Sequence, residues 1–360
     1  MIGCALAVVA VYFAVASFVT DGSVITRRGR AAEVDFILRD MRRLDRDAMG
    51  DAPVTWIVGS SITRESFDAE RIEARMQAAG SAHRVRKFAF NRGAPIFTQA
   101  VVDDLPLRPG DRVVTSIAEG NFRLRWLEEV GDFQTHAQAL LSPWELLAIR
   151  DLALPTRLEW SLASTPPGEF FRNQSAFRRG LVKTIDWRLG LTKKPRIKRH
   201  MSYQPFTDTN NTLRRSSSED WTLPPDEVQL APGQTNYDGL SWLIEDLEGR
   251  GIALTVVYVP GHPWLYEEFV QDETVEAFQA HMDGWEGLDY ARLAPRKGPA
   301  FMDWKHPNNR GRPGFSDELA DLLLTREGMT PPPVEEDRWL ARPDDAPAMP
   351  AVLFTREAPR

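Results

Sequence analysis

Cysteine is nearly absent from this sequence. Its 360 residues contain one, Cys4, which lies inside an apolar segment at the N-terminus. A single cysteine excludes an intramolecular disulfide framework and a metal site built on several thiolates. The sequence also lacks glycine-rich loops of the Walker and G-x-G-x-x-G types, so nothing in it supports nucleotide binding. We therefore expect no bound cofactor and no metal.

The sequence has fewer basic residues (44 Lys and Arg) than acidic ones (51 Asp and Glu). The net charge is −7, which argues against a nucleic-acid-binding protein. The basic residues are unevenly spread, because residues 172–199 contain ten Lys and Arg against one acidic residue and carry about +9. Apolar residues recur there in steps of four, at Phe177, Leu181, Ile185 and Leu189. This stripe suits a helix on an anionic membrane or over an anionic substrate, or ordinary packing onto the domain.

No charge occurs between Met1 and Val19, a run that would span about 28 Å as a helix. We interpret residues 1–20 as a single transmembrane anchor, with the rest of the protein on the extracytoplasmic, periplasmic side. A cleaved signal peptide is the alternative, because residues 14–16 read A-V-A. Arg27, Arg28 and Arg30 favour the opposite orientation by the positive-inside rule.

The rest of the chain divides into three parts. Residues 21–52 are predicted to form a connecting amphipathic helix, with Val34, Ile37, Leu38, Met41 and Leu44 on its apolar face and its end at Pro53. Residues 53–328 form the main domain, interrupted by a largely helical insertion at about 124–234. The tail, 329–360, is rich in proline and acidic residues and is expected to be disordered.

Strand and helix patterns alternate within the main domain. Apolar runs bounded by breakers predict strands at 54–59, 85–90, 111–121 and 252–260, and a short apolar stretch follows at 288–293. Helical patterns lie at 69–79, 99–107, 237–251, 267–282 and 315–324. This order indicates an α/β fold with a parallel sheet, in which functional sites lie beyond the carboxyl ends of the strands.

The first predicted strand ends in Gly59-Ser60-Ser61, which on its own is an ordinary polar turn. Of the six histidines, His306 is distinctive, because Asp303 precedes it by three residues. At this spacing a carboxylate can bind the imidazole Nδ1–H and leave Nε2 free as a general base. A serine activated in this way becomes a nucleophile near neutral pH. A surface D-x-x-H motif without function is the alternative for this pair considered alone.

Other strand ends carry residues suited to binding an oxyanion or a substrate. Gly93 can present an unobstructed backbone N–H, and Asn121 can present its side-chain amide. Each of them, considered singly, is equally a structural turn residue. Ser60 and His262 are predicted to line the substrate site. A metal site formed by Asp303, His306 and His262 is a further alternative.

Taken in order, these four segments resemble the blocks of the SGNH/GDSL hydrolases, over about residues 54–325. The resemblance implies a three-layer, flavodoxin-like fold with a central parallel sheet of about five strands. It implies that Ser61 is the nucleophile, with Ser60 in the position of the family's aspartate, that His306 is the base and that Asp303 orients it. The backbone N–H of Ser61 would form the oxyanion hole with Gly93 and Asn121.

The G-S-S block, the N-terminal apolar segment and the ending D..H.N..G...FS..L are similar to those of anchored family members that modify cell-envelope polymers. These include alginate acetyltransferase-like proteins and the protein for D-alanyl transfer to teichoic acids. The resemblance implies a membrane-anchored serine esterase or O-acyltransferase that acts on an acyl-bearing small molecule or polysaccharide, with a membrane-bound acyl donor as a candidate partner. The third block reads E-G-N-F instead of G-x-N-D. This departure motivates an alternative, a catalytically degenerate scaffold that binds an envelope polymer or a partner protein.

Overall fold

The computed structural model describes residues 44–123, 140–165, 223–268 and 270–333, together with positions 34, 37, 38, 40, 41, 137, 209, 339 and 340. The predicted anchor 1–20, the basic segment 172–199 and most of the tail 329–360 lie outside these residues. Among the residues described, no helix is both long and apolar enough to cross a membrane.

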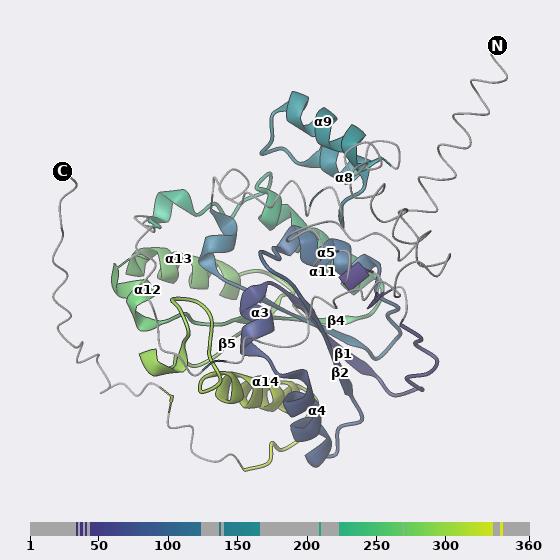
Figure 1. The fold of residues 1–360 in the computed structure, drawn as a ribbon, viewed down its shortest axis with the longest axis vertical. Helices are drawn as coiled ribbons and strands as arrows, with labels where there is room; N and C mark the ends of the chain where they lie inside the picture. The colour runs from purple at the N-terminus through teal and green to yellow at the C-terminus, as the bar shows by residue number, and fades with distance from the viewer. Residues whose placement is uncertain are drawn as a thin grey trace, which may run out of the picture.

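A sheet of five parallel strands lies at the centre of the domain, in the order β2-β1-β3-β4-β5 (Figure 1). The strands are β1 (Val54–Gly59), β2 (Arg84–Ala89), β3 (Arg112–Ile117), β4 (Ala253–Tyr258) and β5 (Asp289–Arg292). Every residue of β1 is buried, as expected for a parallel strand covered on both faces. The expected α/β fold with a parallel sheet is therefore confirmed.

Helices cover both faces of the sheet. Alternate residues of β1 point to opposite sides, so Trp56 and Val58 belong to one core and Ile57 to the other. The first core is completed by α5 (Pro95–Asp103), α11 (Thr235–Gly249) and α13 (Asp272–Asp283). The second is completed by α4 (Ala69–Ala78) and α14 (Arg312–Arg326). In Figure 1, α5 and α11 lie on one side of the strands and α4 and α14 on the other.

The segment before β1 belongs to the domain core. Val34, Ile37, Leu38 and Met41 are helical and buried, and they join the core that contains α5 and α11. Four of the five residues of the predicted apolar face therefore pack into the domain. Leu44, the fifth, is not helical and is only partly buried. The helix ends earlier than the predicted Pro53, because residues 46–49 form a turn.

Three further boundaries differ from the sequence prediction. The helix predicted at 99–107 begins earlier, at Pro95, because proline suits the first turn of a helix, where its missing N–H has no partner to lose. The predicted third strand ends at Ile117, and residues Glu119–Phe122 form a 3₁₀ turn. The helix predicted at 267–282 is two helices, α12 (Pro263–Glu268) and α13.

The described part of the insertion includes two short helices, α8 (Pro143–Ala148) and α9 (Leu154–Ser164). They project from the domain beyond α5 and α11 in Figure 1. Their outer surface is apolar and open to solvent, since Trp144 is 79% and Leu162 69% exposed, and Leu154 and Leu158 are also exposed.

A buried carboxylate fixes the amino ends of the central strands. Asp111 Oδ1 accepts hydrogen bonds from Arg46 (3.0 Å) and from the backbone N–H of Val54 (2.8 Å). Its Oδ2 accepts from the Trp56 indole (3.0 Å) and from the backbone N–H of Arg108 (3.1 Å). Asp111 therefore links the segment before β1, the strand β1 and the turn that leads to β3.

We expect Asp111→Ala to lower the free energy of unfolding by about 3–5 kcal/mol, because the substitution leaves the Arg46 guanidinium buried and without its carboxylate. Urea unfolding followed by circular dichroism measures this loss. Asp47→Ala is the matched control, since Asp47 also pairs with an arginine but is exposed, and it should change stability little. A similar loss in the two variants would contradict the proposed role of Asp111.

Candidate active site

Ser61 lies directly beyond the carboxyl end of β1. The strand ends at Gly59, Ser60 caps the next helix, α3 (Ser61–Ser66), and Ser61 is its first residue. Ser60 Oγ accepts the hydrogen bond of the Ile62 backbone N–H (3.2 Å), so this side chain serves the turn. The hydroxyl of Thr63 pairs with that of Ser116 on β3 at 2.6 Å, which ties α3 to the neighbouring strand. These bonds hold Ser61 at the edge of the sheet.

Asp303 and His306 lie in a tight loop between β5 and α14. The loop is closed by backbone bonds between Met302 and His306 (2.8 Å) and between Asn308 and Ala300 (2.9 Å). Asp303 Oδ1 accepts from the backbone N–H groups two and three residues later, each at 2.8 Å. This is an Asx-type turn, in which the aspartate stabilises the loop that carries the histidine.

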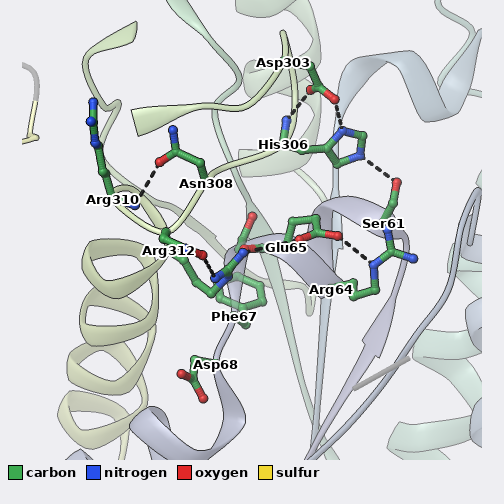
Figure 2. Close-up of polar contacts among 12 residues, drawn as sticks. Ser61, Arg64, Glu65, Phe67, Asp68, Asp303, His306, Asn308, Arg310 and Arg312 are labelled. Atoms are coloured by element: carbon green, nitrogen blue, oxygen red, sulfur yellow. Dashed lines mark hydrogen bonds and ion pairs between the residues drawn. The ribbon is translucent and has the colours of Figure 1, made fainter. Parts of the chain in front are cut away.

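The three predicted catalytic side chains are in hydrogen-bond contact. His306 Nδ1 lies 2.7 Å from Asp303 Oδ2, and His306 Nε2 lies 2.8 Å from Ser61 Oγ (Figure 2). The carboxylate accepts the hydrogen bond of the Nδ1–H group, so Nε2 is the basic nitrogen that faces the serine hydroxyl. The His306 side chain is 23% exposed, which leaves the group accessible from solvent. The sequence spacing between Ser61 and His306 is 245 residues, and the fold brings them together.

Asp303 is held in its ionised form. Burial, the largest single effect, acts to raise the pKa of this carboxyl. The hydrogen bond and charge of His306 and the backbone N–H groups of Lys305 and His306 act in the opposite direction and prevail, so the pKa lies below its usual value. Asp303 can therefore orient His306 and stabilise its protonated form.

Two buried residues fix the histidine loop to the serine helix. Asn308 donates from its amide to the carbonyls of Pro299 and Phe301, both at 3.0 Å, across the base of the loop. Arg312 donates to the backbone carbonyl of Glu65 in α3 at 2.8 Å, and its guanidinium faces the Glu65 carboxylate at 3.4 Å (Figure 2). Asn308 is part of the sequence pattern D..H.N..G...FS..L, but the pattern does not reveal its role. Nothing in the sequence points to Arg312 as a residue of the site.

Lys87 caps the carboxyl end of α3. Its ammonium group is buried beneath the helix and donates to the carbonyls of Arg64 (2.9 Å) and Phe67 (2.6 Å). These carbonyls have no partner within the helix, so a cation there is favourable. Burial nevertheless lowers the pKa of Lys87 to about 8. Nothing in the sequence distinguished this lysine from a surface residue.

The lowered pKa of Lys87 predicts that stability rises at alkaline pH. Between about pH 8 and the usual lysine pKa of about 10.4, the unfolded chain binds the Lys87 proton and the folded chain does not. Unfolding must then take up a proton, so we expect the unfolding free energy to increase by up to about 3 kcal/mol over this range. Urea unfolding at pH 7.5 and pH 10 should show this gain relative to Lys87→Met. Identical pH dependence in the two proteins would contradict the assignment.

Gly93 follows β2 and packs against the backbone of Gly59 and Ser60, and Asn121 follows β3 and lines the same cavity as Ile62. A Cβ atom at Gly93 would lie 2.5 Å from the Gly59 carbonyl oxygen, so only glycine allows the backbones to approach this closely. The Gly93 N–H donates to the Phe90 carbonyl at 3.2 Å. Asn121 accepts the Ala118 N–H through Oδ1, which leaves its Nδ2 donor at the other end of the amide. Their roles in an oxyanion hole, with the Ser61 N–H, stay predictions.

His262 packs against the loop that carries His306. Its backbone N–H donates to the Trp304 carbonyl at 2.9 Å, and its Nδ1 accepts the Trp264 N–H at 3.1 Å. Burial lowers the pKa of His262 to about 4, with Asp303 opposing the shift, so the ring is neutral at pH 7. These contacts give His262 a role in holding the loop. Within the described part of the chain, no group of three or more His, Cys, Asp and Glu residues could hold a metal ion.

A small cavity of about 80 Å³ opens beside the three side chains. It is lined by the residue after Ser61, the residue before His306 and the third block. The lining residues are Ile62, Ala118, Glu119, Gly120, Asn121, Val259, Gly261, Leu265, Tyr266 and Lys305. Glu119 is 3% exposed, and sequence reasoning gave it no role.

No family model and no curated protein matches this chain. The fold is an α/β domain with a five-strand parallel sheet, without a family assignment. The similarity to SGNH/GDSL hydrolases therefore depends on the four sequence blocks and on their arrangement at the carboxyl ends of the strands.

Proposed function

We propose that this protein is an SGNH-like serine esterase or O-acyltransferase. The observation that carries the proposal is the continuous hydrogen-bonded series from Asp303 through His306 to Ser61, with the Ser61 Oγ to His306 Nε2 distance at 2.8 Å. Such a series makes a hydroxyl nucleophilic, because the histidine removes its proton as the oxygen attacks. The three-layer arrangement and the position of the site beyond the strand ends support the same proposal.

The reaction proceeds in two halves. Ser61 Oγ attacks the carbonyl carbon of an acyl ester while His306 Nε2 takes the hydroxyl proton. Collapse of the tetrahedral intermediate breaks the bond to the alcohol, which leaves with that proton, and the acyl group stays on Ser61. Water or a glycan hydroxyl then attacks the acyl carbon and gives its proton to His306. The bond between the acyl group and Ser61 Oγ breaks, and His306 returns the proton to Ser61 Oγ, which regenerates the free serine. A hydrolase and a transferase differ only in this acceptor.

The Ser61 N–H and the Asn121 amide are the proposed donors to the oxyanion, and Gly93 keeps the loop beside them. Preplaced donors of this kind stabilise the negative charge on the carbonyl oxygen in the transition state. The catalytically degenerate scaffold is the second candidate. It is favoured by the Gly93 N–H, which is already bonded to Phe90, and by the altered third block.

A fluorophosphonate probe tests the proposal, because it phosphonylates only a serine that a base has activated. We expect full-length protein to be labelled at Ser61, identified by peptide mass, and Ser61→Ala to remain unlabelled. Phenylmethanesulfonyl fluoride should block the reaction of the wild-type protein. A well-folded wild-type protein that does not react would contradict the enzyme and favour the binding scaffold.

We also propose that the enzyme is held at a membrane, on its extracytoplasmic side, where it meets an envelope glycan and a membrane-bound acyl donor. The uncharged run of residues 1–19 and the basic segment 172–199 support this proposal. So does the apolar outer surface of α8 and α9, where Trp144 and Leu162 are exposed. Protease added to spheroplasts should degrade the domain, and protection from the protease would contradict the orientation.

The position of α9 can be measured with the full chain in anionic lipid nanodiscs. A nitroxide at Leu158→Cys, in a Cys4→Ser background, should collide often with oxygen and rarely with a water-soluble nickel complex. Glu70→Cys on α4 is the matched control, because α4 lies far from α9 in Figure 1 and Glu70 is exposed. Equal nickel accessibility at the two positions would contradict contact between α9 and lipid.

A further inference from the structure

A second cavity, of about 400 Å³, lies between the described part of the insertion and the domain. Its walls come from the end of α8, the turn after it, α9, the turn before α11 and α11 itself (Figure 1). Two arginines, Arg150 and Arg157, line it together with Asp238 and Trp242. A cavity of about 150 Å³ holds benzene, so this one has room for a larger and more polar group.

The two arginines of this cavity have no acidic partner. Within the described part of the chain, Arg150 forms no hydrogen bond or ion pair, and Arg157 donates only to the Leu147 carbonyl, at 3.0 Å. The Nε atom of Arg157 is closed to solvent, but its Nη2 atom is not. Guanidinium groups that line one cavity without a carboxylate attract an anion, and their planar N–H groups match the oxygens of a phosphate.

Asp238 gives the same cavity a negative charge. Its Oδ1 accepts the Gly233 N–H at 2.9 Å, whereas Oδ2 has no partner among the residues described and is open to solvent. Trp242 follows four residues later, on the same face of α11, and its indole ring suits an alkylammonium group through a cation–π contact. The cavity therefore presents an anion site and a cation site side by side, as a ligand with both charges requires.

The helix that carries Arg157 also presents an apolar stripe to solvent. Leu154, Leu158 and Leu162 recur in steps of four along α9, and all three are exposed. Arg157 lies on the side of α9 that faces the domain, because Ser161, one turn later, is buried and donates to the Pro143 carbonyl at 2.8 Å. Interfacial helices place their leucines among acyl chains and their arginines at the level of the phosphates.

We propose that this cavity binds the headgroup of one phospholipid that carries an amine, such as phosphatidylethanolamine. The phosphate lies against Arg150 and Arg157, the ammonium group lies against Asp238 and Trp242, and the acyl chains run beside the leucine stripe of α9. This inference rests on the proposed contact of α9 with lipid and is independent of the chemistry at Ser61. It assigns a specific lipid to a surface that would otherwise bind any apolar phase.

Native mass spectrometry of the full-length protein, released from dodecyl maltoside, tests the headgroup. The protein is mixed with equal amounts of dioleoyl-phosphatidylethanolamine and dioleoyl-phosphatidylglycerol, which have the same acyl chains. We expect about threefold more of the ethanolamine lipid to be bound. Replacing both arginines, by Arg150→Gln and Arg157→Gln, should lower its binding about tenfold, because charged hydrogen bonds to the phosphate are lost. Lipid bound elsewhere contributes equally to every variant.

Two single variants separate the charges of the site. Asp238→Asn keeps an acceptor for the Gly233 N–H and removes the negative charge, so it should lose the preference for the ethanolamine lipid and still bind the glycerol lipid. Arg250→Gln is the matched control for the arginines, because Arg250 lies at the other end of α11, pairs with Asp246 at 3.0 Å and should not affect binding. If the double variant does not fold, Arg150→Gln alone should still weaken binding, since Arg150 has no contact to lose.

The outcomes separate this proposal from those made above. Unchanged lipid binding in the arginine variants, or an unchanged preference in Asp238→Asn, would overturn the headgroup site. Complete displacement of the lipid by inorganic phosphate would also overturn it and assign the cavity to a free anion. None of these results would alter fluorophosphonate labelling of Ser61. Nickel accessibility at Leu158→Cys equal to that at Glu70→Cys, with headgroup binding intact, would overturn only the contact between α9 and lipid.

Discussion

Replacing Ser61 with alanine is expected to lower kcat for ester hydrolysis by about 10⁴- to 10⁶-fold. The substitution removes the hydroxyl that we propose forms the acyl-enzyme, and it leaves His306 without the proton that the proposed mechanism requires. Residual activity would come from the proposed oxyanion donors and from binding. Ser61 is the first residue of α3, and within the described part of the chain its hydroxyl bonds only to His306, so we expect little change in Tm.

Ser60 provides the matched control for this experiment, since it is the neighbouring serine of the same turn. Its Oγ caps α3 through the Ile62 N–H, so Ser60→Ala should cost about 1 kcal/mol of stability and keep kcat within about tenfold. Steady-state kinetics with phenyl acetate and thermal unfolding of both variants measure the difference. A larger loss of activity in Ser60→Ala than in Ser61→Ala would contradict the proposal that Ser61 is the nucleophile.

Much of the fold was predictable because buried parallel strands leave a strong pattern in the sequence. The strands β1, β2, β3 and β4 are largely apolar runs with glycine or polar residues at or shortly after their ends, and the sequence predicts all four close to where they occur. The strand β5, with the sequence D-Y-A-R, is only partly buried at the edge of the sheet. The short apolar stretch at 288–293 does not by itself predict a strand. The strand forms through its pairing with β4, which the local sequence does not show.

The helix α3 could not be predicted for a related reason. Its six residues, S-I-T-R-E-S, are too short to show helical periodicity and resemble a polar turn. Contacts from distant parts of the chain stabilise it, through the bonds of Lys87 to its last carbonyls and of Arg312 to Glu65. Neither contact follows from the residues of the helix itself.

The residues of the candidate site also differ in how far the sequence predicts them, because some of their contacts are local and others are long-range. Asp303 and His306 were recognisable because their contact is local, three residues apart in one loop. Arg312 and Glu65 are separated by 247 residues, and Asn236 reaches the carbonyl of Asn121 from another helix. Glu119 lies in the same block as Asn121, and its burial follows only from the fold. Sequence patterns thus identify the proposed reacting groups, while the residues that position them require the fold.

Asp303→Asn is expected to lower kcat by about 10⁴-fold. The asparagine can keep one oxygen for the backbone N–H groups of the loop, but its amide would donate to His306 Nδ1. That bond selects the tautomer with the proton on Nε2, which then cannot accept the proton of Ser61. Asp317→Asn is the matched control, because Asp317 pairs with Arg71 between α14 and α4, and the substitution should not affect kcat.

The same substitution should change the response of the fold to acid. The pKa of Asp303 is below its usual value in the folded protein, so the unfolded chain binds more protons as the pH falls toward that pKa. The stabilisation from Asp303 is therefore present above the usual carboxyl pKa of about 3.9 and is lost as the pH falls below it. Urea unfolding at pH 7 and pH 3 should show a smaller loss for Asp303→Asn than for the wild-type protein. Equal losses would contradict the claim that His306 helps to keep Asp303 ionised. A kcat within tenfold of wild type would contradict the claim that Asp303 orients His306.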